Sequence, residues 1–277
     1  IVVSDFHLGA GFDPHTGARD PLELFRNDEA FARFLDFVRE DCRAHRRSCR
    51  LVILGDLFDL PRVRIGWQPR NADEAIDATR TRLSRIVDGH PEFFAALGRF
   101  AAEGWPIHLV PGNHDMPIMC PNVFSWLSSQ LAALTPHGNV PRLQMHPWIF
   151  YEPDLFYAEH GHQYHDINSY PALLAQATPD AWLEVQTIGA ALDEVAMLLA
   201  ALSGGATPPS ASPSALAKRI VTHPRLAART APASARLLAL LARRLVNPSA
   251  YFGAGDREIY RTTWIRDHAS HVGLDQA

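Results

Sequence analysis

Three short apolar runs in the first half of the chain constrain the fold more than any other feature of the sequence. They occupy residues 1–3, 51–54 and 107–110, and each is followed at once by turn-forming glycine, proline or polar residues. Runs of this length with such boundaries are typical of buried strands. Between them, apolar spacings of three and four predict helices over 22–45, 72–87 and 91–103. Strands that alternate with helices predict an α/β fold with a buried sheet.

The pattern changes after residue 142. Two further runs, 148–151 and 155–157, flank a Glu-Pro-Asp turn and predict a hairpin. We expect a core at 1–165, a helical insertion or cap at 166–263, and a return to the core at 264–277. Within the cap the sequence predicts helices over 179–202, 216–222 and 234–246, a proline- and serine-rich linker at 203–214, and a break between helices at Pro224 and Pro232.

Composition narrows the class of protein. The chain has 277 residues, 47% hydrophobic and 20% charged, which suits one or two globular domains and not a disordered chain. No apolar run reaches the ~18 residues that a membrane-spanning helix needs. The three cysteines are odd in number and form no C-x-x-C pair. This favours free thiols and a cytoplasmic location over disulfides or a cysteine-based zinc site.

The net charge of −4 hides an uneven distribution. Residues 195–255 hold seven basic and no acidic side chains, so the remainder of the chain carries −11, the difference between −4 and +7. We interpret 234–246 as a cap helix with its arginines in water. The alternative is a lid that recruits an anionic lipid or polyphosphate, or a peripheral contact with a membrane surface. Nucleic acid is not favoured as a partner, because no aromatic residues are interleaved with the basic ones.

Four polar residues directly follow the predicted strands. Asp5 and His7 follow the first, Asp56 the second and Asn113 the third. Ligands of open α/β sheets bind beyond the carboxyl ends of the strands, so these side chains can converge in one pocket. Carboxylate, imidazole and amide donors together favour Mn²⁺, Fe²⁺ or Zn²⁺ over Mg²⁺. Each residue alone could equally be a turn former or a helix cap, and the combination is what indicates metal.

The motifs Asp-Phe-His at 5–7, Gly-Asp-Leu-Phe-Asp at 55–59 and Gly-Asn-His-Asp at 112–115 resemble, in this order, those of the calcineurin-like metallophosphoesterases. His160, followed by glycine, resembles the later histidine motif of that family. The resemblance implies a four-layer sandwich, two sheets flanked by helices, with a helical cap insertion. It further implies that Asp5 and His7 bind a first metal ion, Asp56 bridges two ions, Asn113 and His160 bind the second, His114 contacts the phosphoryl oxygen or leaving group, and Asp59 orients His114.

The family's Gly-His-x-His element is missing from the given sequence, and we expect it to follow residue 277. The opening at residues 4–9 and the helical cap also resemble the bacterial UDP-2,3-diacylglucosamine hydrolases. Those enzymes tend to carry arginine at the position of His114, so a phosphomonoesterase or phosphodiesterase acting on another substrate is equally open. Arg62 and Arg64 are candidates for substrate phosphate, with solvated loop arginines as the alternative.

The predicted function is a dinuclear metal-dependent hydrolase in which a metal-bound hydroxide attacks a phosphate ester or anhydride. We expect two divalent ions, with Mn²⁺ as the preferred metal and Fe²⁺ or Zn²⁺ as alternatives. We expect a phosphorylated small molecule or lipid as substrate. The rival hypothesis is a non-catalytic binding or scaffold protein that kept the fold and lost its metals.

Overall fold

The computed structural model describes residues 1–13, 15–136, 140–165, 167–170, 183, 187–203 and 224–246. The chain divides into two compact units. The first comprises Ile1–His160 with Thr178–Glu184, and the second comprises Gly161–Ala177 with Val185–Ala277. The predicted helix at 216–222, nearly all of the linker at 203–214 and the return to the core at 264–277 lie outside the described residues.

A parallel sheet of four strands forms the centre of the first unit. Its order is β1 (Val2–Val3), β2 (Leu51–Leu54), β3 (Ile107–Val110) and β4 (Leu143–Met145), and every neighbouring pair is parallel. The first three are the strands that the apolar runs predict. All four carboxyl ends therefore lie at the same edge of the sheet. The fold class is confirmed as α/β with a parallel sheet and helices.

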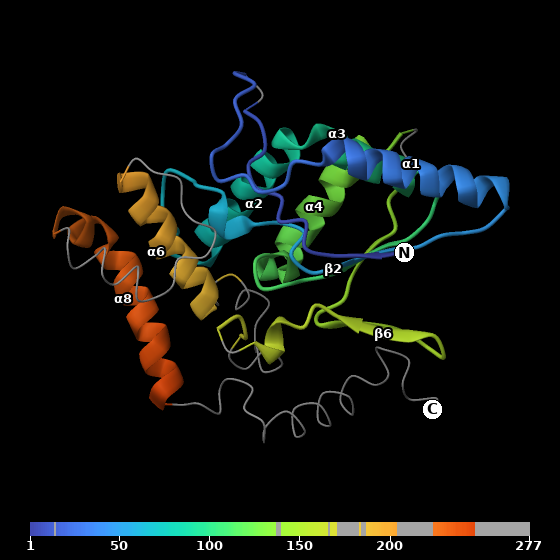
Figure 1. Cartoon of the computed structure of the whole chain (residues 1–277). Helices are drawn as coiled ribbons and strands as arrows, with labels where there is room; N and C mark the ends of the chain where they lie inside the picture. Colours follow the sequence, from blue (N-terminus) through green and yellow to red (C-terminus); the bar gives the residue numbers. More distant parts are fainter. Residues whose placement is uncertain are drawn as a thin grey trace. The chain divides into compact units, whose positions relative to one another are not determined.

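Four helices cover one face of this sheet (Figure 1). They are α1 (Asp28–Ala44), α2 (Ala72–Gly89), α3 (Pro91–Ala101) and α4 (Pro121–Leu134). Successive side chains of a strand point to opposite faces, and Leu51 and Ile53 of β2 accordingly join the helical core. The helix α4 is absent from the sequence predictions, although Val123, Leu127 and Leu131 recur every four residues and are buried.

The opposite face of the sheet packs against an antiparallel hairpin, β5 (Ile149–Glu152) and β6 (Phe156–Glu159). Val52 of β2 and Val110 of β3 form a small second core with Phe150 of β5. The predicted hairpin is therefore confirmed. The sheet is buried between the helices and the hairpin, which explains the almost continuous apolar runs of its central strands.

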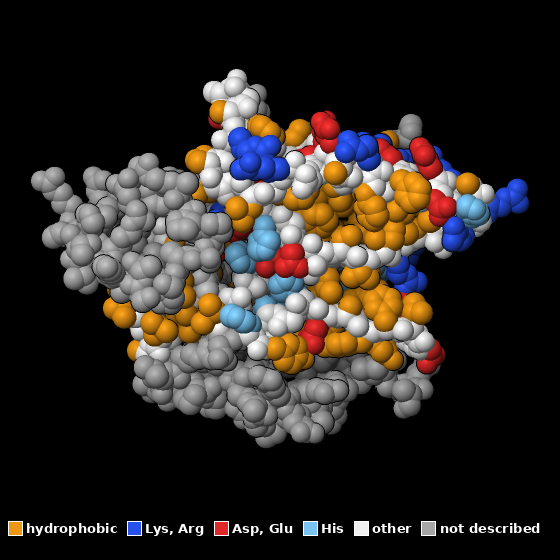
Figure 2. Space-filling view, in the orientation of Figure 1, with side chains coloured by type: hydrophobic (Ala, Val, Ile, Leu, Met, Phe, Trp, Pro, Cys, Tyr) orange, Lys and Arg blue, Asp and Glu red, His pale blue; other side chains and the backbone are white. Residues whose placement is uncertain are grey.

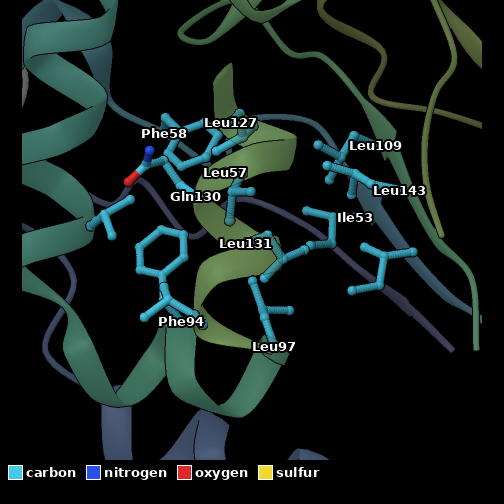
Figure 3. A pocket seen from close by; sticks show the side chains of 13 residues that line it. Ile53, Leu57, Phe58, Phe94, Leu97, Leu109, Leu127, Gln130, Leu131 and Leu143 are labelled. Atoms are coloured by element: carbon cyan, nitrogen blue, oxygen red, sulfur yellow. The ribbon is translucent and has the colours of Figure 1, made fainter. Parts of the chain in front are cut away.

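A small cavity of about 20 Å³ lies inside the helical core, between the sheet and helices α3 and α4 (Figure 3). Its lining is apolar except for Gln130, and includes Ile53, Phe94 and Leu131. None of the strand-end polar residues lines it. The cavity is a packing defect of the core and has the character of a dry void, so the chemistry of the protein has to be sought at the strand ends.

In the second unit, α6 (Ile188–Ser203) packs against α8 (Pro224–Val246). The predicted break at Pro232 is wrong, because α8 runs through this residue. Proline removes the bond to the carbonyl four residues earlier, and both Pro232 and Ala228 are exposed, so water can satisfy that carbonyl. Among the described residues no helix is both long and apolar enough to cross a membrane.

Candidate metal centre

The loops after β1 and β2 present their polar residues in an unusual backbone conformation. Asp5, His7 and Asp56 all have positive φ, at 56°, 51° and 49°. This left-handed region costs an ordinary residue about 1–2 kcal/mol. Backbone strain of this kind clusters at functional sites, where the surrounding structure holds it. The backbone N–H groups of Asp5 and His7 donate to the carbonyls of Gly55 and Asp56, which ties the two loops together.

Two glycines allow these loops to approach one another. A Cβ on Gly55 would lie 2.2 Å from Nδ1 of His160, and a Cβ on Gly112 would lie 2.1 Å from Oδ1 of Asp56. Both distances are far below any van der Waals contact. The glycine before Asp56 and the glycine before Asn113 are therefore required by the close approach of the three loops around the site.

The structure brings the predicted residues into two groups that share Asp56. Potential ligand atoms of Asp5, Asp56 and His160 all lie within 4.8 Å of one another, and the same holds for His7, Asp56 and His114. Asp5 is thus grouped with His160, whereas the family resemblance places it with His7 on the first ion. Figure 2 shows histidine and acidic side chains meeting on one face of the molecule.

The orientation of the imidazoles suits a cation. Nδ1 of His160 lies 3.1 Å from the carbonyl of Leu54 and donates to it, which directs Nε2 to Oδ2 of Asp56 at 3.3 Å. Metal-binding histidines commonly donate their other ring nitrogen to a carbonyl in this way. Nε2 of His7 lies 3.6 Å from the same oxygen, and Nδ1 of His7 lies 3.5 Å from Oδ2 of the buried Asp59. These donor atoms fit a divalent ion.

The charges of the site also favour a cation. Burial raises the pKa of Asp56, but His160 and His114 lower it by a larger amount. The pKa of this carboxyl therefore lies below its usual range. Burial lowers the pKa of His160, whereas the Asp56 carboxylate raises it, and the net result is about 9. A metal ion at Asp56 would therefore replace the proton on His160 as the positive partner of this carboxylate.

A second pair lies beside these groups. Nδ1 of His114 is 2.9 Å from Oδ1 of Asp59, and Asp59 is fully buried. Burial raises the pKa of Asp59, but hydrogen bonds from His114 and His7 lower it to about 2. Asp59 is therefore a carboxylate at neutral pH, and Nε of Arg62 lies 3.0 Å from its other oxygen.

Two further predicted residues differ in their burial. Asn113 is buried, 5% exposed, at the end of β3 beside His114. Arg64 is exposed, and its backbone carbonyl accepts a hydrogen bond from the Arg85 guanidinium. Of the two candidate arginines, the structure thus brings Arg62 to the site, through Asp59, and leaves the Arg64 side chain in solvent.

The sequence analysis missed one residue of the site, Asp115. Its Oδ1 accepts from the N–H of Gly112 at 2.7 Å, and its Oδ2 accepts from Leu57 and Phe58 at 2.8 and 3.2 Å. Burial and the neighbouring Asp56 carboxylate raise the pKa of Asp115 to about 6. Asp115 thus ties the loop after β2 to the loop after β3. Its signal in the sequence is its place at the end of the Gly-Asn-His-Asp motif at 112–115, directly after His114.

Together, the fold and the site define an α/β protein with a candidate metal centre at the carboxyl ends of its parallel strands. Residues 1–196 match the calcineurin-like phosphoesterase family, and the chain belongs to that family. Its members are metal-dependent hydrolases of phosphoesters, so the predicted class of enzyme and the need for divalent metal are supported. No match was found among curated proteins or among solved structures.

Proposed function

We propose that this protein is a dinuclear phosphoesterase that cleaves phosphate ester or anhydride bonds. The observation that carries the proposal is that Asp56 belongs to both candidate ligand groups. A carboxylate offers two oxygens, so Asp56 would be able to hold both cations of a two-metal site. When bound, two divalent ions supply a hydroxide nucleophile at neutral pH and neutralise the charge of the phosphoryl oxygens. We propose Mn²⁺ as the preferred metal, with Fe²⁺ or Zn²⁺ as alternatives.

The remaining residues then serve the phosphoryl group and the leaving oxygen. Asp59 accepts from Nδ1 of His114 and so fixes the ring, and the opposite nitrogen can protonate or stabilise the leaving oxygen. Arg62, held against Asp59, places a positive charge next to the same region. A guanidinium there is suited to the oxygens of a bound phosphate.

An assay of the full-length protein tests the proposal. Chelator-treated protein should be inactive on 4-nitrophenyl phosphate and on bis(4-nitrophenyl) phosphate, and Mn²⁺ should restore hydrolysis of at least one of them. Asp56→Asn should abolish the restored activity. Asp77→Asn, which alters a carboxylate with 68% exposure on α2, serves as the control and should leave it intact. Tight Mn²⁺ binding without hydrolysis of either ester would favour the non-catalytic alternative.

The basic segment is proposed to bring substrate to this centre. Helix α8 carries five arginines and no acidic residue. Leu238 and Leu241 are exposed on it, whereas Arg236 is paired with Glu194 of α6. Exposed leucines beside arginines suit an anionic lipid or the surface of a membrane that contains it. In this proposal the protein is cytoplasmic and contacts the membrane peripherally.

The recruitment proposal is tested by co-sedimentation with vesicles of phosphatidylglycerol and, separately, of phosphatidylcholine. We expect binding to the anionic vesicles only, and loss of binding in Arg243→Glu/Arg244→Glu. Because exposed charges are screened within ~10 Å at 0.1 M salt, binding should also weaken as salt rises. Equal binding of wild type and variant would leave α8 as a structural helix of the cap.

A further inference from the structure

A buried ion cluster lies behind the loop that carries Asp5 and His7. It consists of Glu23, Asp28 and His90, and both Glu23 and His90 are almost fully buried. Nδ1 of His90 lies 2.7 Å from Oδ1 of Asp28, and Nε2 lies 3.1 Å from Oε2 of Glu23. An ionised carboxylate only accepts hydrogen bonds, so both ring nitrogens donate and His90 is an imidazolium.

The charge states of the partners agree with this geometry. Burial lowers the pKa of His90, but its bonds to Asp28 and Glu23 raise it to about 9. Burial raises the pKa of Glu23, but its bonds from His90 and from backbone N–H groups lower it below its usual range. At neutral pH the ion cluster therefore consists of one buried cation between two carboxylates.

Glu23 connects the ion cluster to the ligand loop. Its Oε2 accepts from the N–H of Gly11 at 2.6 Å, and its Oε1 accepts from Gly9 at 3.3 Å and from Phe25 at 2.7 Å. Gly9 lies two residues after His7. The N–H of Phe12 also donates to the carbonyl of Gly89, directly before His90, so the loop is held at several points in succession.

A cluster of aromatic rings holds the same loop from its other side. Phe6, between Asp5 and His7, makes edge-to-face contacts with Phe25, Phe31 and Phe93 at centroid distances of 5.7, 5.0 and 5.1 Å. Phe25 is itself bound through its N–H to Glu23. Displacement of Glu23 would therefore reach the ligand loop by two routes, through Gly9 and through Phe25 and Phe6.

We propose that Glu23 and His90 are positioning residues of the metal centre, which hold the Asp5–His7 loop in its metal-binding conformation through the N–H groups of Gly9, Gly11 and Phe25. This inference rests on the proposed function, because it assigns the loop to metal binding. Neither residue reaches the candidate ligands directly. Outer hydrogen-bond partners of metal ligands typically change metal affinity by about 10-fold to 100-fold when they are lost.

The competing explanation is that the ion cluster only stabilises the contact between α1 and the start of α3. The chain provides a matched control for this. Asp36 of α1 binds Arg99 of α3 at 2.9 and 3.1 Å, and thus links the same two helices far along their length from the ligand loop. Asp36→Asn should lower stability without any effect on the loop.

The experiment compares wild type, His90→Gln, Glu23→Gln and Asp36→Asn as full-length proteins. Glutamine at 90 can donate to one carboxylate but cannot bridge two, and Glu23→Gln is the milder change if His90→Gln does not fold. Hydrogen exchange by mass spectrometry measures the protection of residues 8–12, and calorimetric titration measures Mn²⁺ affinity. Each protein is measured at the same interval below its own Tm.

We expect at least tenfold faster exchange over residues 8–12 and at least tenfold weaker Mn²⁺ binding in a folded variant of Glu23 or His90, with both unchanged in Asp36→Asn. Unchanged exchange overturns the inference, and so does faster exchange with unchanged Mn²⁺ affinity. An equal loss in Asp36→Asn overturns it as well. A wild type that protects the loop but binds no Mn²⁺ contradicts the proposed function itself, and is distinguished by that combination.

Discussion

Replacing Gly55 by alanine should disrupt one half of the metal centre although no ligand is replaced. The new Cβ would lie 2.2, 2.3 and 2.7 Å from Nδ1, Cγ and Cβ of His160. Because the clash extends to the Cβ of His160, rotation of the imidazole alone does not relieve it. The whole side chain has to move away from Leu54 and Asp56.

The magnitude follows from the contacts that are lost. The hydrogen bond from His160 to the Leu54 carbonyl contributes about 0.5–1.5 kcal/mol, and the contact with the Asp56 carboxylate, as a hydrogen bond to a charged group, about 1.5–3 kcal/mol. Alanine at a φ of +80° adds about 1–2 kcal/mol of backbone strain. Gly55→Ala should therefore lower the free energy of unfolding by roughly 3–6.5 kcal/mol.

Gly104→Ala provides the control, because Gly104 has a φ of +75° and no atom within 4 Å of the added Cβ. It should show the backbone strain alone. Urea unfolding followed by circular dichroism measures stability, and calorimetric titration measures Mn²⁺ affinity. We expect Gly55→Ala to be less stable than Gly104→Ala by about 2–4.5 kcal/mol and to bind Mn²⁺ more weakly. Equal stability and equal affinity in the two variants would refute the argument.

Two further predictions concern His114 and His90. His114→Ala should keep its bound metal and lose at least 100-fold in kcat, as expected for a group that serves the leaving oxygen; loss of metal in elemental analysis would instead make His114 a ligand, as its place beside His7 and Asp56 allows. Contacts with Asp28 and Glu23 raise the pKa of His90 from 6.5 to about 9. Protonation of this ring therefore stabilises the fold, and this contribution is fully present below pH 6.5 and is lost as pH rises through 9. The free energy of unfolding of wild type, measured in urea, should therefore fall by up to about 3 kcal/mol between pH 6.5 and 9.5. A fall of the same size in His90→Gln would show that other groups cause it.

The sequence predicted the parts of the fold that local pattern determines. Strands β1, β2 and β3 could be predicted because each joins a short apolar run to a polar turn. Asp5, His7 and Asp56 could then be placed in one site, because ligands of open α/β sheets bind beyond the carboxyl ends of the strands. The strand β4 was missed because Leu143–Met145 is only three residues long and partly exposed. The predicted break at Pro232 was wrong because a proline in a sequence indicates the end of a helix. How much a proline destabilises a helix depends on whether the unpaired carbonyl is exposed to water in the folded chain.

The supporting residues of the site depend on tertiary contacts that no local pattern encodes. Asp115 accepts from Leu57 and Phe58, which lie almost sixty positions earlier, and His90 meets Glu23 across a similar separation. Asp115 ends the Gly-Asn-His-Asp motif at 112–115, but neither its neighbours nor those of His90 show which distant groups the side chain binds. Their roles follow from burial, since a buried charge has to find partners, and those partners are known only once the chain is folded.

The most direct test of the central claim, that Asp56 is shared by two divalent ions, is the metal content of the full-length protein and its Asp56→Asn variant. Both are loaded with Mn²⁺, desalted and analysed for manganese per chain. We expect two ions in wild type and fewer than one in Asp56→Asn, because the loss of one anionic carboxylate weakens both sites at once. Two ions retained in the variant, or a single ion in wild type at saturating Mn²⁺, would contradict it.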